Sequence, residues 1–107
     1  MNHTEMATAL AFRILLARNE IASKEVAKVL NIIPSGISKI INFKRDLSFA
    51  EMVIFCHHYN ISISEASDLV LKISRNKKVL QQIKELKEAS GLTQRKITTL
   101  LSSIACS

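Results

Sequence analysis

Cysteine and histidine occur together at one place in this 107-residue chain, in the sequence Cys56-His57-His58. These residue types supply nucleophiles, general bases and zinc ligands. Neighbouring residues on a helix point about 100° apart, so the three side chains cannot converge on one atom. Helical metal sites use pairs four residues apart, and no other His or Cys lies close in the sequence. We therefore expect no catalytic centre, no metal site and no cofactor, and place both histidines on the surface at a helix end.

A second group of polar residues, between positions 35 and 42, suits recognition by hydrogen bonding. At helical spacing the outward positions combine small or hydrogen-bonding residues with one cation, a surface that fits base edges in the major groove of DNA. Lys39 and Asn42 are the best candidates for reading sequence, and Gly36 would permit close approach. The residues predicted to contact bases are Ser35, Gly36, Ser38, Lys39 and Asn42.

Two short helices are expected to position this polar surface. Apolar residues recur three and four positions apart over residues 23–30 and again over residues 34–42. The break between them leaves room only for a tight corner, at which Ala27 allows close approach and Pro34 suits the first helical turn. Two helices joined in this way also occur in proteins that never bind nucleic acid. The spacing alone therefore does not decide the function.

The net charge of +6 is unevenly distributed along the chain. Residues 23–45 carry five cations against one carboxylate, whereas residues 46–71 carry four carboxylates and no Lys or Arg. Residues 72–96 carry eight cations against two carboxylates, of which Lys84 and Lys87 are explained as well by solubility. Cations concentrated around the predicted contact residues indicate a polyanionic partner. The residues predicted to contact phosphates are Lys24, Lys28, Lys44 and Arg45.

The run from Ser23 to Ala66 resembles the Cro/repressor (XRE-like) helix-turn-helix regulators of phages and bacteria. The matching segments are EVAKVL, PSGISKIIN and FKRDLSFAEMVIFCHHYNISISEA. Asn31 and Phe43 stand where glycine is usual, and Asn is the better tolerated because it adopts the left-handed conformation more readily. The resemblance implies a five-helix DNA-binding domain. A more distant similarity, to short phage activators of lysogeny, leaves repressor and activator both open.

Three further helices are expected in this domain. The first covers about residues 5–18, with Met6, Leu10, Ile14 and Ala17 on one stripe. The fourth and fifth follow Ser48 and Ser62, each of which has glutamate three positions on, as in a capping box. The inner face of the fourth is expected to consist of Phe49, Met52, Val53 and Cys56. The predicted fold is therefore all-α, with a helix-turn-helix domain over residues 1–74 and a basic linker at 75–78.

Residues 79–107 contain two more amphipathic stretches, joined around Gly91 and Thr93. The segment KELKEASGLTQRKITTLL resembles the first two helices of the same class, but the chain has no room for a second recognition helix after it. A helical pair with an apolar face either completes the core or joins two subunits, and we favour dimerisation. The residues predicted to mediate it are Ile83, Leu86, Ile97, Leu100, Leu101 and Ile104.

Composition restricts the location and the class of protein. No apolar run approaches the roughly 18 residues of a membrane span, and the N-terminus lacks the basic start and apolar core of a signal peptide. Two cysteines, Cys56 and Cys106, make no disulfide framework, so we expect the cytoplasm. No small-molecule ligand is evident.

These features predict a DNA-binding transcription regulator without enzymatic activity. We expect it to bind double-stranded DNA sequence-specifically as a homodimer or a tetramer, on a palindromic operator with half-sites roughly 34 Å apart. The alternative is a protein-interaction module, such as an antirepressor or a regulatory partner, that keeps the fold without binding DNA.

Overall fold

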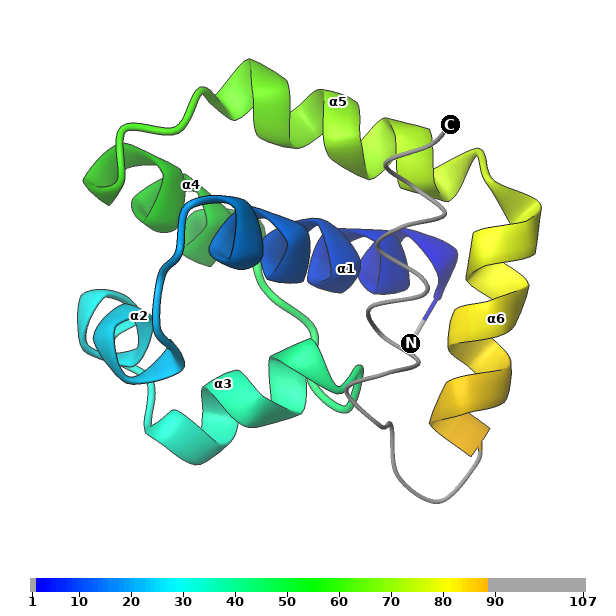
Figure 1. Cartoon of the computed structure of the whole chain (residues 1–107), viewed down its shortest axis with the longest axis horizontal. Coiled ribbons are helices and arrows are strands. Elements are labelled where there is room, and N and C mark those ends of the chain that lie inside the picture. Colours follow the sequence, from blue (N-terminus) through cyan, green and yellow to red (C-terminus); the bar gives the residue numbers. More distant parts are fainter. Residues whose placement is uncertain (1, 89–107) are drawn as a thin grey trace.

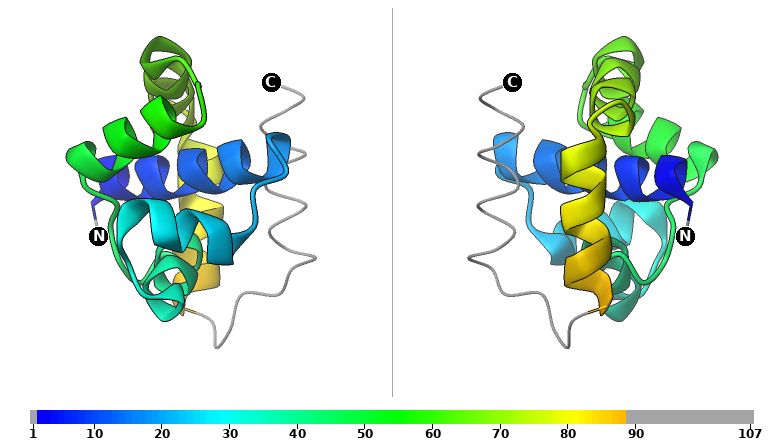
Figure 2. Two further views of the ribbon diagram at one scale, coloured as in Figure 1. Left: turned by 90° about the vertical axis from the view of Figure 1, so that its left-hand side faces the viewer. Right: turned by 90° about the vertical axis from the view of Figure 1, so that its right-hand side faces the viewer.

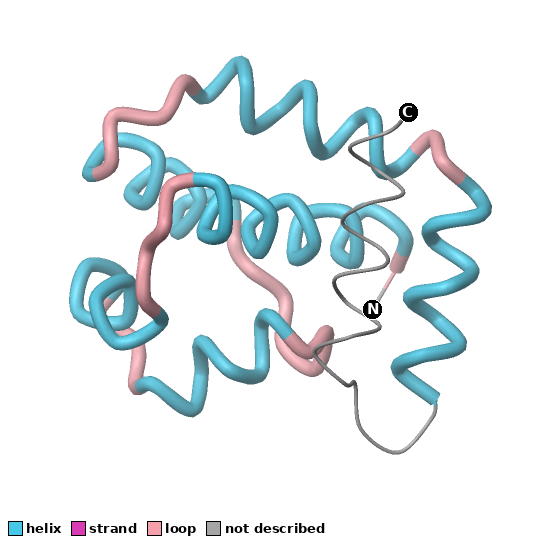
Figure 3. Tube along the Cα trace, in the orientation of Figure 1, coloured by secondary structure: helices cyan, strands magenta, loops and turns pink. Residues whose placement is uncertain are grey.

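The computed structural model describes residues 2–88, which form six α-helices and no strand (Figure 1, Figure 3). The expectation of an all-α chain is confirmed for these residues. The helices are α1 (His3–Arg18), α2 (Ser23–Leu30), α3 (Pro34–Ile41), α4 (Phe49–His58), α5 (Ile63–Ser74) and α6 (Lys77–Glu88). In the part of the chain from 2 to 88, no helix is long and apolar enough to cross a membrane.

Helix α1 runs through the middle of the molecule and is buried on nearly all sides. It packs against α3, α5 and α6, and Figure 2 shows the other helices arranged around it. Most side chains between Met6 and Leu16 are buried, including the small Ala7, Ala9 and Ala11. Met6, Leu10 and Ile14 of the expected stripe are buried, but the buried surface extends around the whole helix, because a central helix has to be apolar all round. Ala17, expected on that stripe, is exposed.

Four helices, α1, α4, α5 and α6, begin with a side chain that caps free backbone N–H groups. Ser48 Oγ accepts from the Glu51 amide (3.1 Å) and Glu51 Oε1 accepts from the Ser48 amide (2.9 Å), which confirms the predicted capping box of α4. At α5 only half of the expected pair forms, with Ser62 Oγ accepting from the Glu65 amide at 3.4 Å. A box that sequence analysis missed, between Asn2 and Glu5, opens α1.

Four helices end with a residue in the left-handed conformation. At each end the following amide donates to a carbonyl five residues back, at 2.8–2.9 Å, as in a Schellman motif. After α1, α2 and α4 that following residue is an isoleucine packed against the core, whereas after α3 it is the exposed Lys44. The left-handed residues are Glu20 (φ 53°), Asn31 (φ 54°), Phe43 (φ 59°) and Asn60 (φ 55°).

The aromatic core differs from the expectation at α4. Phe49 is 78% exposed, although it was expected to face inward, because it begins the helix and lies outside the inner face. Met52 and Cys56 are buried on that face as expected, whereas Val53 is only partly buried. Phe55 is buried there as well, and its ring meets Phe12 of α1 edge-on at 4.9 Å. Phe43 is also fully buried.

Helix α6 completes the core and is not separated from it by a linker. Only Arg75 and Asn76 lie between α5 and α6, so the basic linker predicted at 75–78 is wrong for its second half. Asn76 Oδ1 accepts from the amide of Val79 at 3.1 Å and so caps α6. Val79, Leu80 and Ile83 are buried, in a helix that packs on α1 and α5.

This packing corrects one of the predicted dimerisation residues. Ile83 has no exposed surface, so it belongs to the core of its own chain and is not available to a second subunit. The remaining predicted dimerisation residues lie beyond the described side chains, and their role stays a prediction: Leu86, Ile97, Leu100, Leu101 and Ile104.

Candidate nucleic-acid interface

Helices α2 and α3 form a steep corner at the lower side of the molecule. Figure 1 shows α2 end-on and α3 lengthwise, so their axes cross at a large angle. Asn31 makes the turn in the left-handed conformation (φ 54°, ψ 44°), as its residue type predicted. Ala27 is 3% exposed and Ile37 and Ile40 are fully buried, so the inner faces of both helices lie in the core. The outer face of α3 is thereby directed away from the molecule.

Gly36 lies inside this corner and not on its outer face. A Cβ atom at this position would come within 2.5 Å of Ile32 Cγ2, closer than side-chain atoms pack. The residue is buried, so the prediction that it contacts bases is wrong. Its lack of a side chain lets the turn fold back against α3, and this supports the corner itself.

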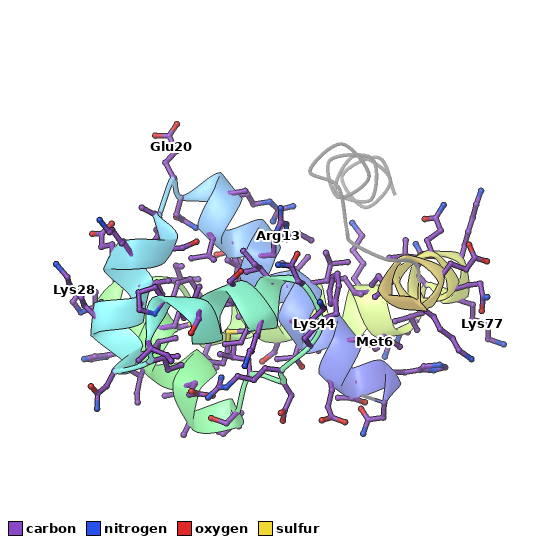
Figure 4. The ribbon with its side chains drawn as sticks, turned by 90° about the horizontal axis from the view of Figure 1, so that it is seen from below. Met6, Arg13, Glu20, Lys28, Lys44 and Lys77 are labelled. Atoms are coloured by element: carbon purple, nitrogen blue, oxygen red, sulfur yellow. The ribbon has the colours of Figure 1, made fainter. Side chains whose placement is uncertain are left out.

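Three of the predicted base-contact residues project from α3 without cover. Ser35, Ser38 and Lys39 are exposed, and Figure 4, seen from below, shows α3 lying across the near face. Lys28 projects beyond the α2 end of that face and Lys44 lies towards its other end. The lysines around this face make no ion pair with another described residue: Lys24, Lys28, Lys39 and Lys44.

Asn42 is partly occupied within its own helix. Its Nδ2 donates to the carbonyl oxygen of Ser38 at 2.9 Å, the same bond that Asn19 Nδ2 makes to Leu15 at the end of α1 (2.8 Å). The Ser38 carbonyl oxygen also accepts from the Asn42 backbone amide at 3.1 Å, so the side chain adds a second hydrogen bond at the C-terminus of α3. Its Oδ1 remains as the atom that a base donor can meet.

Arg45 is bound within the protein. Its guanidinium lies 3.1 Å from the carboxylate of Glu51 and also donates to the Asp46 carbonyl oxygen at 3.3 Å. Burial acts to raise the pKa of Glu51, but hydrogen bonds from Ser48 and Arg45 outweigh it and hold the pKa below its ordinary value. Arg45 therefore links the α3–α4 loop to the start of α4, and its predicted phosphate contact is revised to a positioning role.

Ile33 is a surface residue that sequence analysis assigned only to the corner. It is the N-cap of α3 and is 71% exposed, which is unusual for a large apolar side chain. Its neighbour Ile32, by contrast, packs against the core. Its exposure could have been predicted from its position before Pro34. An N-cap residue precedes the helix, so its side chain does not lie on the apolar face of that helix.

The Cys56-His57-His58 sequence does not converge on one point. Cys56 is buried, and burial together with the nearby Glu65 carboxylate raises the pKa of its thiol. Both histidines are exposed, and the His58 ring packs on Tyr59 with 4.8 Å between centroids. Within residues 2–88, no three His, Cys, Asp or Glu side chains form a group that could hold a metal ion.

Comparisons of this chain with protein-family models, with curated proteins and with solved structures found no match.

Proposed function

We propose that this chain is a sequence-specific DNA-binding transcription regulator of the helix-turn-helix type, in which α3 is the recognition helix. The observation that carries the proposal is the outer face of the α2–α3 corner. It presents Ser35, Ser38 and Lys39 to solvent and is surrounded by lysines that have no ion-pair partner among residues 2–88. A surface of hydrogen-bonding groups flanked by unpaired cations complements bases flanked by phosphates.

In the proposed complex α3 enters the major groove, which is about 12 Å wide and admits a helix. Ser35, Ser38 and Lys39 meet base edges, and the Asn42 amide oxygen accepts from a base donor. Lysines on both sides of α3 neutralise phosphates and set the register: Lys24 and Lys28 from α2, and Lys44 from the loop that follows α3.

Ile33 adds an apolar contact to this set. Among the groups exposed in the major groove, the 5-methyl group of thymine is the one that an isoleucine recognises. Burying one methyl-sized group contributes about 0.8 kcal/mol, or roughly fourfold in affinity. This contact gives a reason for the exposure of Ile33, which packing in the core does not explain.

The corner holds the recognition surface in place before binding. Gly36 packs beneath Ile32, and buried Phe43 anchors the end of α3 directly before Lys44. The Lys44 amide donates to the Lys39 carbonyl oxygen at 2.8 Å. Because these contacts exist without DNA, little ordering is required of the backbone on binding.

A salt series with two matched variants tests the proposal. Affinity for a duplex enriched from a random pool is measured from low to physiological salt for wild type, Lys44→Ala and Lys77→Ala. Lys77 is an equally exposed lysine on α6, far from α3 in Figure 4. Lys44→Ala should lower the salt slope by about one and weaken all sequences alike, whereas Lys77→Ala should leave it unchanged.

Equal behaviour of the two variants would show that binding is not directed through the α3 face. Weak binding without sequence preference in wild type would instead favour a protein-interaction module with the same fold.

Replacing thymine by uracil in the enriched duplex, one position at a time, tests the role of Ile33. Wild type should lose roughly fourfold in affinity at one position of each half-site, and Ile33→Ala should show no loss there. Equal losses in both proteins would assign the methyl contact to another residue.

A further inference from the structure

An apolar groove lies between the N-terminal half of α1, α4 and α5, away from the α2–α3 corner. It has a volume of about 440 Å³ and is lined mainly by Phe49, Met52, Ile63, Val70 and Leu71. Its polar contribution is small and includes Thr4 and Thr8 of α1. In Figure 4, α4 and the N-terminal end of α1 lie along one edge of the face that α3 presents, so an occupant of this groove leaves α3 accessible.

The groove gathers most of the exposed large apolar side chains among the described residues. These are Phe49 (78% exposed), Leu71 (48%) and Ile63 (40%), whereas the other two, Ile33 and Ile54, do not line it. A cluster of this kind beside a hollow marks a binding surface more often than scattered apolar residues do.

The charges near the groove select among its occupants. Residues 46–71, which supply most of the lining, carry four carboxylates and no Lys or Arg. Glu51 is paired with Arg45, but Asp46, Glu65 and Asp68 lie in the segments that supply the lining, so a second copy docked groove to groove would place like charges on both sides of the contact. An apolar helix with cations and no carboxylates is a better match.

The chain itself contains such a segment. Residues 89–107 lie outside the described part, and their sequence has Arg95 and Lys96 but no Asp or Glu. Their apolar residues recur at helical spacing: Leu92, Ile97, Leu100, Leu101 and Ile104. This is the amphipathic and basic character that the groove requires.

The length of α6 favours exchange between two copies over docking in the same chain. Helix α6 has 12 residues, about 18 Å, and leads away from α5 in Figure 1. The connection from Glu88 to Leu92 spans at most about 14 Å, which is shorter than α6, so in the same chain Leu92 cannot reach back to the α5 end of that helix. In the groove of a second copy, the apolar residues from Leu92 to Ile104 can all be buried.

We propose that residues 92–104 of one copy bind as a helix in the groove of a second copy, and that the exchange is reciprocal and closes a two-fold dimer. This contact would be the interface of the operator-binding dimer. Only its role in DNA binding rests on the proposed function. Two identical contacts related by a two-fold axis form a closed assembly.

Sedimentation of the full chain over a concentration series tests the contact with a matched control. Leu71→Lys places a cation in the groove, and Ile54→Lys makes the same change at a residue of equal exposure outside it (49%). Leu71→Lys should weaken dimerisation at least about 30-fold, as expected for a central interface residue, and Ile54→Lys should leave it unchanged. A double variant of the tail, Ile97→Asp with Leu101→Asp, should match Leu71→Lys.

Mixing the two defective proteins separates exchange from other arrangements. The intact tail of Leu71→Lys fits the intact groove of the tail variant, so the mixture should form mixed dimers that neither protein forms alone. Circular dichroism checks the fold, and Phe49→Ser, at a 78% exposed position, replaces Leu71→Lys if that variant unfolds.

Three results would overturn the proposal: a wild-type monomer at all concentrations, a dimer that survives Leu71→Lys, or a mixture that stays monomeric. A wild-type protein that dimerises in this way but does not bind DNA would contradict the proposed function and leave the dimer contact standing.

Discussion

Replacing Gly36 by alanine tests the packing of the α2–α3 corner. The substitution has two opposing effects on stability, a clash with Ile32 and the higher helix propensity of alanine, and these can be measured separately. The new methyl group would lie 2.5 Å from Ile32 Cγ2, so the backbone or Ile32 must shift. Such overpacking costs about 1–3 kcal/mol. Alanine in place of glycine stabilises a helix by at most about 1 kcal/mol, and less in the first turn, where Gly36 lies. The clash should dominate, and Gly36→Ala should lower the free energy of unfolding by about 1 kcal/mol.

The same substitution should change sign once the opposing methyl group is gone. In an Ile32→Ala background Cγ2 is absent, so only the helix-forming advantage of alanine remains, and Gly36→Ala should then stabilise by a few tenths of a kcal/mol up to about 1 kcal/mol. Urea unfolding of the four full-length proteins, at one protein concentration, measures both steps. Equal effects of Gly36→Ala in the two backgrounds, or a stabilised single variant, would refute the assignment of Gly36 to the corner.

Three further predictions concern the core and the α3–α4 loop. Phe43→Gly relieves about 1–2 kcal/mol of left-handed strain but loses about 3–5 kcal/mol of aromatic packing, so urea unfolding should show a net loss of roughly 2 kcal/mol; a more stable variant would contradict the anchoring role. The pKa of Glu51 is lowered in the folded state, so at neutral pH wild type should have a higher free energy of unfolding than Glu51→Gln, by up to about 1 kcal/mol. This difference should disappear as the pH falls through the ordinary glutamate range and then through the folded pKa. A difference that does not change with pH would exclude this linkage. Burial raises the pKa of the Cys56 thiol, so in a Cys106→Ser protein a thiol reagent should react only after unfolding, and rapid labelling of the native protein would show that Cys56 is accessible.

The helices of residues 2–88 were largely predictable because their ends carry local signals. Serine followed by glutamate three positions on marks the start of α4, and Pro34 marks that of α3. Asn31 adopts the left-handed turn that its residue type favours. These signals depend on backbone hydrogen bonds within a few residues, so no knowledge of the tertiary structure is needed to read them.

Errors arose where the outcome depends on what a side chain meets from elsewhere in the fold. Gly36 falls on the outward positions of a helical wheel, but Ile32 folds back over it from the turn. Phe49 and Ile33 are apolar and exposed because each lies at a helix start, outside the inner face. Arg45 looked available to a phosphate until the fold brought Glu51 within 3.1 Å of it.

The candidate interface was predicted in outline and then narrowed. Ser35, Ser38 and Lys39 keep their place on the outer face of α3, and the side-chain amide of Asn42 keeps its oxygen for a contact. Gly36 and Arg45 moved to supporting roles, and the exposed Ile33 joined the proposed contacts. Periodicity identifies a helix face, but the few residues at its edges depend on the neighbouring turn.

The proposal that the α3 face reads DNA is tested most directly by selection from a random duplex pool with the purified full chain, followed by sequencing of the retained DNA. The proposal predicts enrichment of a palindrome whose half-sites are centred about 10 base pairs apart, as expected for two α3 helices on one face of the duplex. The enrichment should be lost in a Ser35→Glu, Ser38→Glu variant that remains folded. A retained pool without any common sequence, or the same palindrome enriched by that variant, would contradict it.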